Sequence, residues 1–170
     1  PALSVEVIAH IADLLSPETK GALVPPTADE DPRLPRLQVT VAGHDRQLHL
    51  RRFGDPADPV ALVLPGGPGA DFRLLLPLRA LAERYHVVMW DPRGAGLSER
   101  VPEAELGLEP FGEEIEAVRQ AVAGGRPVTL IGHSLGASVM LRYTAANPEA
   151  VEQLVLIEPG RFQMGSPDDE

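Results

Sequence analysis

Short runs of almost entirely apolar residues recur through the middle of the chain. They occupy residues 60–64, 85–90, 128–131 and 154–157. Apolar runs of this length, with no polar side, are typical of strands in a parallel sheet that is covered on both faces. Between them, apolar residues recur at helical spacing over residues 74–84, 111–123 and 135–146. The alternation of strand and helix predicts an α/β fold built on a doubly wound, mostly parallel sheet.

The remaining segments divide the chain into three parts. Residues 37–41 and 47–53 predict two more strands, joined by a hairpin turn at residues 42–45. The helical spacing of residues 3–15 and the prolines and acidic residues of 21–36 predict an N-terminal helix followed by an extended linker. We therefore expect a helix and proline-rich linker over residues 1–36, a folded core over 37–160 and a polar tail over 161–170.

Composition and charge narrow the classes of partner. The 170 residues include no cysteine, which excludes disulfides and thiolate metal sites. The formal net charge of −10 argues against nucleic acid and anionic membranes as partners. The sequence also has no run of 18 apolar residues and no signal-peptide pattern, so we expect a cytoplasmic protein without a membrane partner.

One motif contains a candidate catalytic residue, because a serine stands where a predicted strand meets a predicted helix. The sequence Gly132-His133-Ser134-Leu135-Gly136 follows the run 128–131 directly. At such a sharp corner the serine hydroxyl stands clear of the sheet, and the crowded flanking positions must be small. Gly132 and Gly136 meet that need, which makes Ser134 a candidate nucleophile. The alternative is a chance Gly-x-Ser-x-Gly in a loop.

Two further motifs follow predicted strands in the same way. Pro65-Gly66-Gly67-Pro68-Gly69 follows residues 60–64, and Asp91-Pro92-Arg93-Gly94-Ala95-Gly96-Leu97-Ser98 follows residues 85–90. With the serine motif, these segments resemble the α/β-hydrolase superfamily, and more narrowly its proline-iminopeptidase-like branch with a His-Gly-Gly-Pro-Gly loop. The resemblance covers residues 37–160 and only the N-terminal part of that fold, without its last strands and lid. Two features depart from the branch: Pro65 replaces its histidine, and Gly-His-Ser-Leu-Gly is typical of general esterases.

Attack of a serine on a carbonyl places negative charge on the carbonyl oxygen, which backbone N–H groups stabilise. We expect one donor to be the N–H of Leu135, at the start of the predicted helix. The resemblance implies Gly67 as the other. The glycine loop Pro65–Gly69 has two alternative interpretations. It could be merely a tight turn, or a nucleotide-binding loop, although it has neither Gly-x-Gly-x-x-Gly nor a Walker lysine. We expect Asp91 and Arg93 to hold the turn after their strand, by pairing with each other or with backbone groups.

The expected catalytic site is incomplete. A serine hydrolase needs a histidine base and an acid, which in this architecture follow the serine. All five histidines, namely His10, His44, His49, His86 and His133, precede Ser134. We expect the side chain of His133 to point away from the nucleophile. Glu158, at the end of the run 154–157, is a candidate acid.

The sequence thus predicts a serine hydrolase that cleaves an ester, amide or small peptide through an acyl-enzyme on Ser134, with no metal or other cofactor. Serine in place of aspartate argues against haloalkane dehalogenase or epoxide hydrolase chemistry. The histidine and the acid are expected from outside the chain, either from a second chain or from a missing C-terminal segment. The alternative is a degenerate, non-catalytic binding protein with the same fold.

Overall fold

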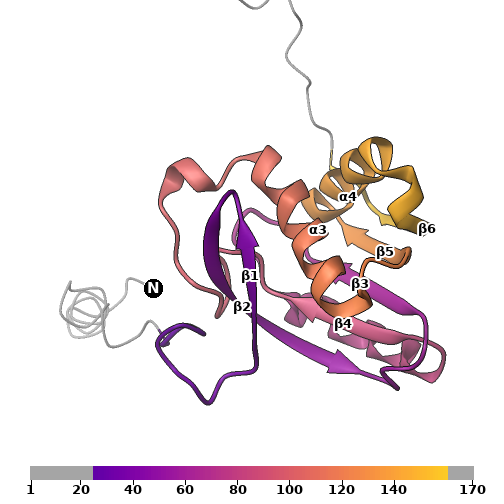
Figure 1. The fold of residues 1–170 in the computed structure, drawn as a ribbon, viewed down its shortest axis with the longest axis horizontal. Coiled ribbons are helices and arrows are strands. Elements are labelled where there is room, and N and C mark those ends of the chain that lie inside the picture. The colour runs from indigo at the N-terminus through magenta and orange to yellow at the C-terminus, as the bar shows by residue number, and fades with distance from the viewer. Residues whose placement is uncertain (1–24, 161–170) are drawn as a thin grey trace, which may run out of the picture.

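The computed structural model describes residues 25–160, which fold around one six-stranded sheet (Figure 1). The strands are β1 (Arg36–Val41), β2 (His44–Phe53), β3 (Val60–Leu64), β4 (His86–Trp90), β5 (Val128–His133) and β6 (Val151–Ile157). The helices are the 3-10 helices η1 (Phe72–Glu83), η2 (Glu103–Glu105) and η3 (Pro148–Ala150) and the α-helices α3 (Leu108–Ala123) and α4 (Leu135–Ala146). The predicted N-terminal helix (3–15) and polar tail (161–170) lie outside the described residues.

The sheet has the order β1-β2-β4-β3-β5-β6. The first two pairings, β1 with β2 and β2 with β4, are antiparallel, and the other three are parallel. Leu62 on β3 faces Val88 on β4 and Leu130 on β5, which puts the run 60–64 at the centre of the parallel part. This arrangement confirms the predicted α/β fold with a mostly parallel sheet. β6 forms one edge, where Val155 is 43% exposed.

The alternation of side chains along the central strands builds two apolar layers. On one face, Leu62, Trp90 and Leu130 pack with residues of α3 and α4. Figure 1 shows these two helices on the same side of the sheet. On the other face, Val63 and Met89 pack with residues of η1. Because each central strand is buried on both sides, its sequence has no polar side, which explains the almost entirely apolar runs.

Three local features differ from the sequence prediction. The helix predicted over residues 74–84 is the 3-10 helix η1, which begins at Phe72, ends at Glu83 and contains Pro77, whose missing N–H removes one helical hydrogen bond. β2 begins at His44, because Ala42 and Gly43 alone close the hairpin, both with positive φ. Within the predicted linker, residues 25–35 contain turns, and the N–H of Ala28 donates to Leu97 O at 2.8 Å.

The described helices include none with the length and apolar character that a membrane crossing requires.

Candidate functional site

Ser134 occupies a strained corner between β5 and α4. Its backbone has φ 50° and ψ −117°, a combination that residues with a side chain rarely adopt. The flanking glycines are needed for space. A Cβ on Gly132 would lie 2.6 Å from Ala137 N, and one on Gly136 would lie 2.6 Å from Leu64 O. The structure therefore contains the tight strand-to-helix turn that the sequence predicts.

Backbone hydrogen bonds fix this corner from the β6 side. The N–H of Ser134 donates to Ile157 O at 2.9 Å, and Ser134 O accepts from Gly160 N at 3.2 Å. The hydroxyl of Ser138, one turn along α4, donates to Gly160 O at 2.8 Å. Sequence reasoning missed Gly160, because its contact with Ser134 depends on the parallel pairing of β5 with β6.

The glycine loop after β3 packs directly against the serine. A Cβ on Gly66 would lie 2.9 Å from Ser134 Cβ, so no larger residue fits there without movement. Gly67 has φ 144°, and a Cβ on it would lie 2.8 Å from Gly69 N. The structure thus identifies Gly66 as a contact that the sequence did not single out. The assignment of Gly67 and Leu135 as oxyanion donors stays a prediction.

The Ser134 hydroxyl makes no hydrogen bond to another residue within 25–160. The carboxylate of the candidate acid Glu158 lies close to the neighbouring His133, with 4.0 Å between Glu158 Oε2 and His133 Nε2. The Glu158 side chain is 87% exposed, and its backbone φ is 45°. His133 Nδ1 is buried and has no partner among the described residues. The role of Glu158 as the acid stays a prediction.

Asp91 organises the loop after β4 through a histidine and two amides. Its Oδ2 lies 2.9 Å from His49 Nδ1 and accepts from Leu97 N, while its Oδ1 accepts from Phe72 N at 3.0 Å. The expected structural role is confirmed through these backbone bonds. The expected alternative of a pair between Asp91 and Arg93 is wrong, because the carboxylate is already occupied. Sequence analysis assigned His49 no role at this loop.

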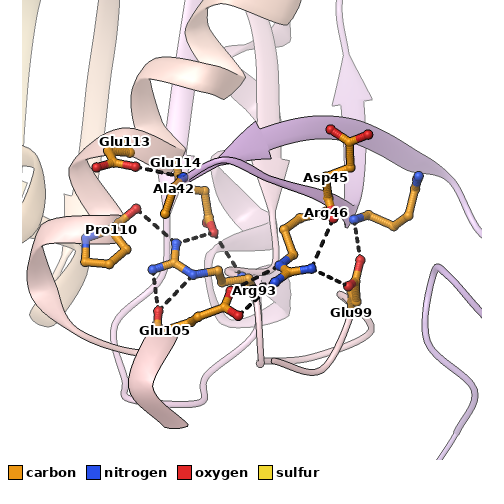
Figure 2. Close-up of polar contacts among 10 residues, drawn as sticks. Ala42, Asp45, Arg46, Arg93, Glu99, Glu105, Pro110, Glu113 and Glu114 are labelled. Atoms are coloured by element: carbon orange, nitrogen blue, oxygen red, sulfur yellow. Dashed lines mark hydrogen bonds and ion pairs between the residues drawn. The ribbon is translucent and has the colours of Figure 1, made fainter. Parts of the chain in front are cut away.

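Arg93 pairs instead with Glu114 on α3, at 3.0 Å between Nη1 and Oε2. Both side chains are 1% exposed, and Trp90 Nε1 donates to Glu114 Oε1 at 2.9 Å. Burial raises the pKa of Glu114, while the hydrogen bonds from Trp90 and Arg93 oppose that rise. Figure 2 shows this pair together with a second arginine, Arg46, bound to Glu105.

A cavity of about 260 Å³ opens beside the strained corner. All three sequence motifs contribute to its lining, through Pro65 and Gly66, Arg93, and Leu135. α3 adds a further wall with Phe111. The loops at the carboxyl ends of parallel strands β3, β4 and β5 therefore meet at one site, which is where ligands bind in open α/β sheets.

Comparison with known proteins agrees with this geometry. A family model described as "alpha/beta hydrolase fold" matches residues 59–169. The chain is 35% identical over 99 residues to a proline iminopeptidase of Heyndrickxia coagulans, which covers 58% of this chain and 34% of the relative. It is 32% identical over 102 residues to a putative carbamate hydrolase, RutD, of Klebsiella pneumoniae, covering 60% of this chain and 38% of the relative.

One solved structure is similar to this chain over most of its length. The crystal structure of a membrane phospholipase A, a bacterial virulence factor, superimposes with a TM-score of 0.62 and 29% identity. The match covers 89% of this chain and 49% of the phospholipase chain. The chain thus spans about a third of the length of the two curated relatives and about half of this structural neighbour.

Proposed function

The chain belongs to the α/β-hydrolase fold family, and from this premise we propose that it is a serine hydrolase whose nucleophile is Ser134. The observation that carries the proposal is the strained backbone of Ser134, with φ 50°, at the junction of β5 and α4. A residue other than glycine is held in such a conformation only where the surroundings enforce it, and such positions cluster at functional sites.

The proposed reaction has two steps. Ser134 Oγ bonds to the carbonyl carbon of an ester, amide or small peptide, and the bond from that carbon to the leaving group breaks. The hydroxyl proton passes through a histidine base to the leaving group. A water molecule then releases the acid and restores the serine. The N–H groups of Leu135 and Gly67 stabilise the oxyanion, and each is worth roughly 3–4 kcal/mol of barrier.

The base and the acid belong to the proposal as well. Neither His133 nor His49 serves as the base in it, since no hydrogen bond joins either imidazole to the Ser134 hydroxyl within residues 25–160. We assign the base to a residue outside this chain, in a second chain or a C-terminal segment. The named relatives, an iminopeptidase, a carbamate hydrolase and a phospholipase, support hydrolysis as the reaction class.

A fluorophosphonate probe tests the proposal, because it reacts with serines that are activated as nucleophiles. In the purified full-length protein, together with the second chain if that chain supplies the base, we expect the probe mass on the peptide that contains Ser134. Ser134→Ala should abolish labelling. Ser138→Ala is the matched control, since Ser138 lies one turn along α4 and its hydroxyl already donates to Gly160 O. A folded full-length protein, with any such second chain present, that the probe leaves unlabelled would contradict the proposal.

A second candidate, a non-catalytic binding protein, is favoured by one observation. The Ser134 hydroxyl lacks a hydrogen-bonded base within residues 25–160. The binding hypothesis predicts that Ser134→Ala changes neither ligand affinity nor biological activity, whereas the hydrolase hypothesis predicts loss of activity with affinity retained.

A further inference from the structure

The cavity beside Ser134 is lined mostly by apolar side chains and by glycine and proline backbone. Leu64, Leu106, Phe111, Leu135 and Val139 supply its larger apolar surfaces. Its volume of about 260 Å³ is below the range of about 300–1,000 Å³ that drug-sized ligands occupy. The space therefore suits a small apolar group, placed next to the carbonyl carbon that Ser134 would attack.

Arg93 is the one charged residue among the described residues that line the cavity, and its guanidinium is already bound. Nε and Nη2 donate to Glu105 O, and Nη1 donates to Pro110 O and to the carboxylate of Glu114. Its side chain is 1% exposed, and the guanidinium lies over the ring of Phe111 at 5.2 Å. A substrate carboxylate would have to displace these partners. Arg93 therefore supports the cavity wall formed by Leu106 and Phe111 instead of recognising an anion.

Glu105, the residue before the cavity-lining Leu106, is held from two sides, as Figure 2 shows for its contacts with Arg93 and Arg46. The main-chain oxygen of Glu105 accepts from Arg93 at 2.6 Å, and its carboxylate accepts from Arg46 Nη2 at 2.7 Å. Arg46 also pairs with Glu99 at 3.1 Å. Glu105 is the last residue of η2, and Leu106 follows it directly. The Leu106 side chain lies over Gly94, where an added Cβ would come within 2.8 Å of Leu106 Cδ2.

Leu106 is 44% exposed, yet the residue before it is bound by two arginines on β2 and on the loop after β4. An exposed leucine on an ordinary turn would move freely to admit a longer group. Here the double anchor fixes the backbone from which the side chain projects. The wall formed by Leu106 and Phe111 is therefore rigid enough to limit the size of the bound group.

We propose that this cavity binds the acyl group of the substrate, and that Leu106 and Phe111, positioned by Arg93 and Arg46, restrict it to short, uncharged, apolar acyl chains. The inference rests on the proposed serine hydrolase function and names the substrate class of the same site. Leu106 and Phe111 determine specificity in it, and the two arginines are positioning residues.

A series of p-nitrophenyl esters, from acetate to dodecanoate, tests the proposal on the full-length protein. We expect kcat/KM to rise about fourfold for each added methylene, which is the effect of burying one such group. The rise should end at about four to eight carbon atoms, because the cavity is smaller than a drug-sized site. An ester whose acyl chain ends in a carboxylate should be a poorer substrate than the uncharged ester of equal length.

Leu106→Ala and Leu141→Ala form a matched pair, since both leucines are about equally exposed, at 44% and 48%, and Leu141 does not line the cavity. Leu106→Ala should raise the ratio of kcat/KM for octanoate over butanoate about tenfold. Leu141→Ala should leave that ratio unchanged. Arg46 lies outside the cavity. If its bond to Glu105 positions the wall, Arg46→Met should also raise the octanoate-to-butanoate ratio.

The two proposals fail in different ways. A folded protein that fluorophosphonate does not label overturns the hydrolase function and this inference with it. A labelled protein overturns this inference alone if the two leucine variants have the same profile, if Arg46→Met leaves the ratio at the wild-type value, or if the carboxylate-bearing ester is preferred.

Discussion

Glu114 on α3 pairs with Arg93 on the loop after β4, at 3.0 Å and with both side chains 1% exposed. The pair joins the helix layer to the carboxyl edge of the sheet, at the cavity that Arg93 helps to line. Buried charges are costly to desolvate, and a pair of this kind is retained only where further hydrogen bonds satisfy its remaining atoms. Trp90, Glu105 and Pro110 supply those bonds.

Glu114→Ala should therefore destabilise the protein strongly, because it leaves the Arg93 guanidinium buried and without its carboxylate. We expect a loss of about 3–5 kcal/mol in the free energy of unfolding, measured by urea denaturation of the full-length protein. Glu152→Gln is the control, since Glu152 lies exposed on β6, and such a substitution changes stability by less than about 0.5 kcal/mol. Equal effects of the two substitutions would contradict the structural role of the pair.

Two glycines in helices should respond to alanine with opposite signs. A Cβ on Gly136 would lie 2.6 Å from Leu64 O, whereas a Cβ on Gly112 in α3 meets nothing within 4 Å. Gly112→Ala should stabilise the protein by about 0.5–1 kcal/mol through helix propensity. At Gly136 the overlap with backbone outweighs that gain, and we expect a loss of about 1–3 kcal/mol. Urea denaturation of both variants measures the difference, and stabilisation by Gly136→Ala would show that the turn is not crowded.

The central strands and the serine corner could be predicted because their signals are local. The apolar run 60–64 matches β3 residue for residue, since a strand buried on both faces needs no polar position. Gly132 and Gly136 were identified for the same reason, because a tight turn around Ser134 requires small neighbours in the sequence itself. The family resemblance extended this local reading to the glycine loop.

The partners of the charged residues could not be predicted, because they are set by the packing of distant segments. Arg93 and Asp91 are two positions apart and read as a local pair, yet Asp91 meets His49, 42 positions away, and Arg93 meets Glu114, 21 positions away. Which carboxylate faces which basic side chain depends on the strand order, in which β4 lies between β2 and β3. No local pattern encodes that order.

Acid should destabilise the contact between α3 and α4. A hydrogen bond from Arg119, with others from Tyr143 and Gln120, lowers the pKa of Glu116 from 4.5 to about 2. Since the carboxyl returns to its ordinary pKa on unfolding, the unfolded chain binds the proton more tightly. The stability that Glu116 contributes is therefore present above pH 4.5 and is lost as the pH falls toward about 2.

Glu116→Gln should remove that part of the pH dependence. The variant should be less stable than the wild type at pH 7, and the gap between their urea midpoints should narrow as the pH falls from about 5 to about 2. Because the Glu116 side chain is 37% exposed, solvent screening makes the gap modest. A gap that stays constant over this range would show that the carboxyl keeps its ordinary pKa.

The strain at Ser134 should be visible as a gain in stability when the side chain is removed. A φ of 50° with a ψ of −117° costs a residue with a Cβ roughly 1–3 kcal/mol, and glycine adopts it without that cost. Glycine also makes the unfolded chain more flexible, which offsets about 0.4–1 kcal/mol. Ser134→Gly should therefore be more stable than Ser134→Ala by about 1 kcal/mol, while both lose fluorophosphonate labelling.

At Ser138, which has ordinary helical geometry within α4, the order should reverse, with glycine less stable than alanine by about 1 kcal/mol. Urea denaturation of the four variants compares the two positions directly. The same order at both would mean that the corner stores no strain, and the main physical support for Ser134 as the nucleophile would be lost.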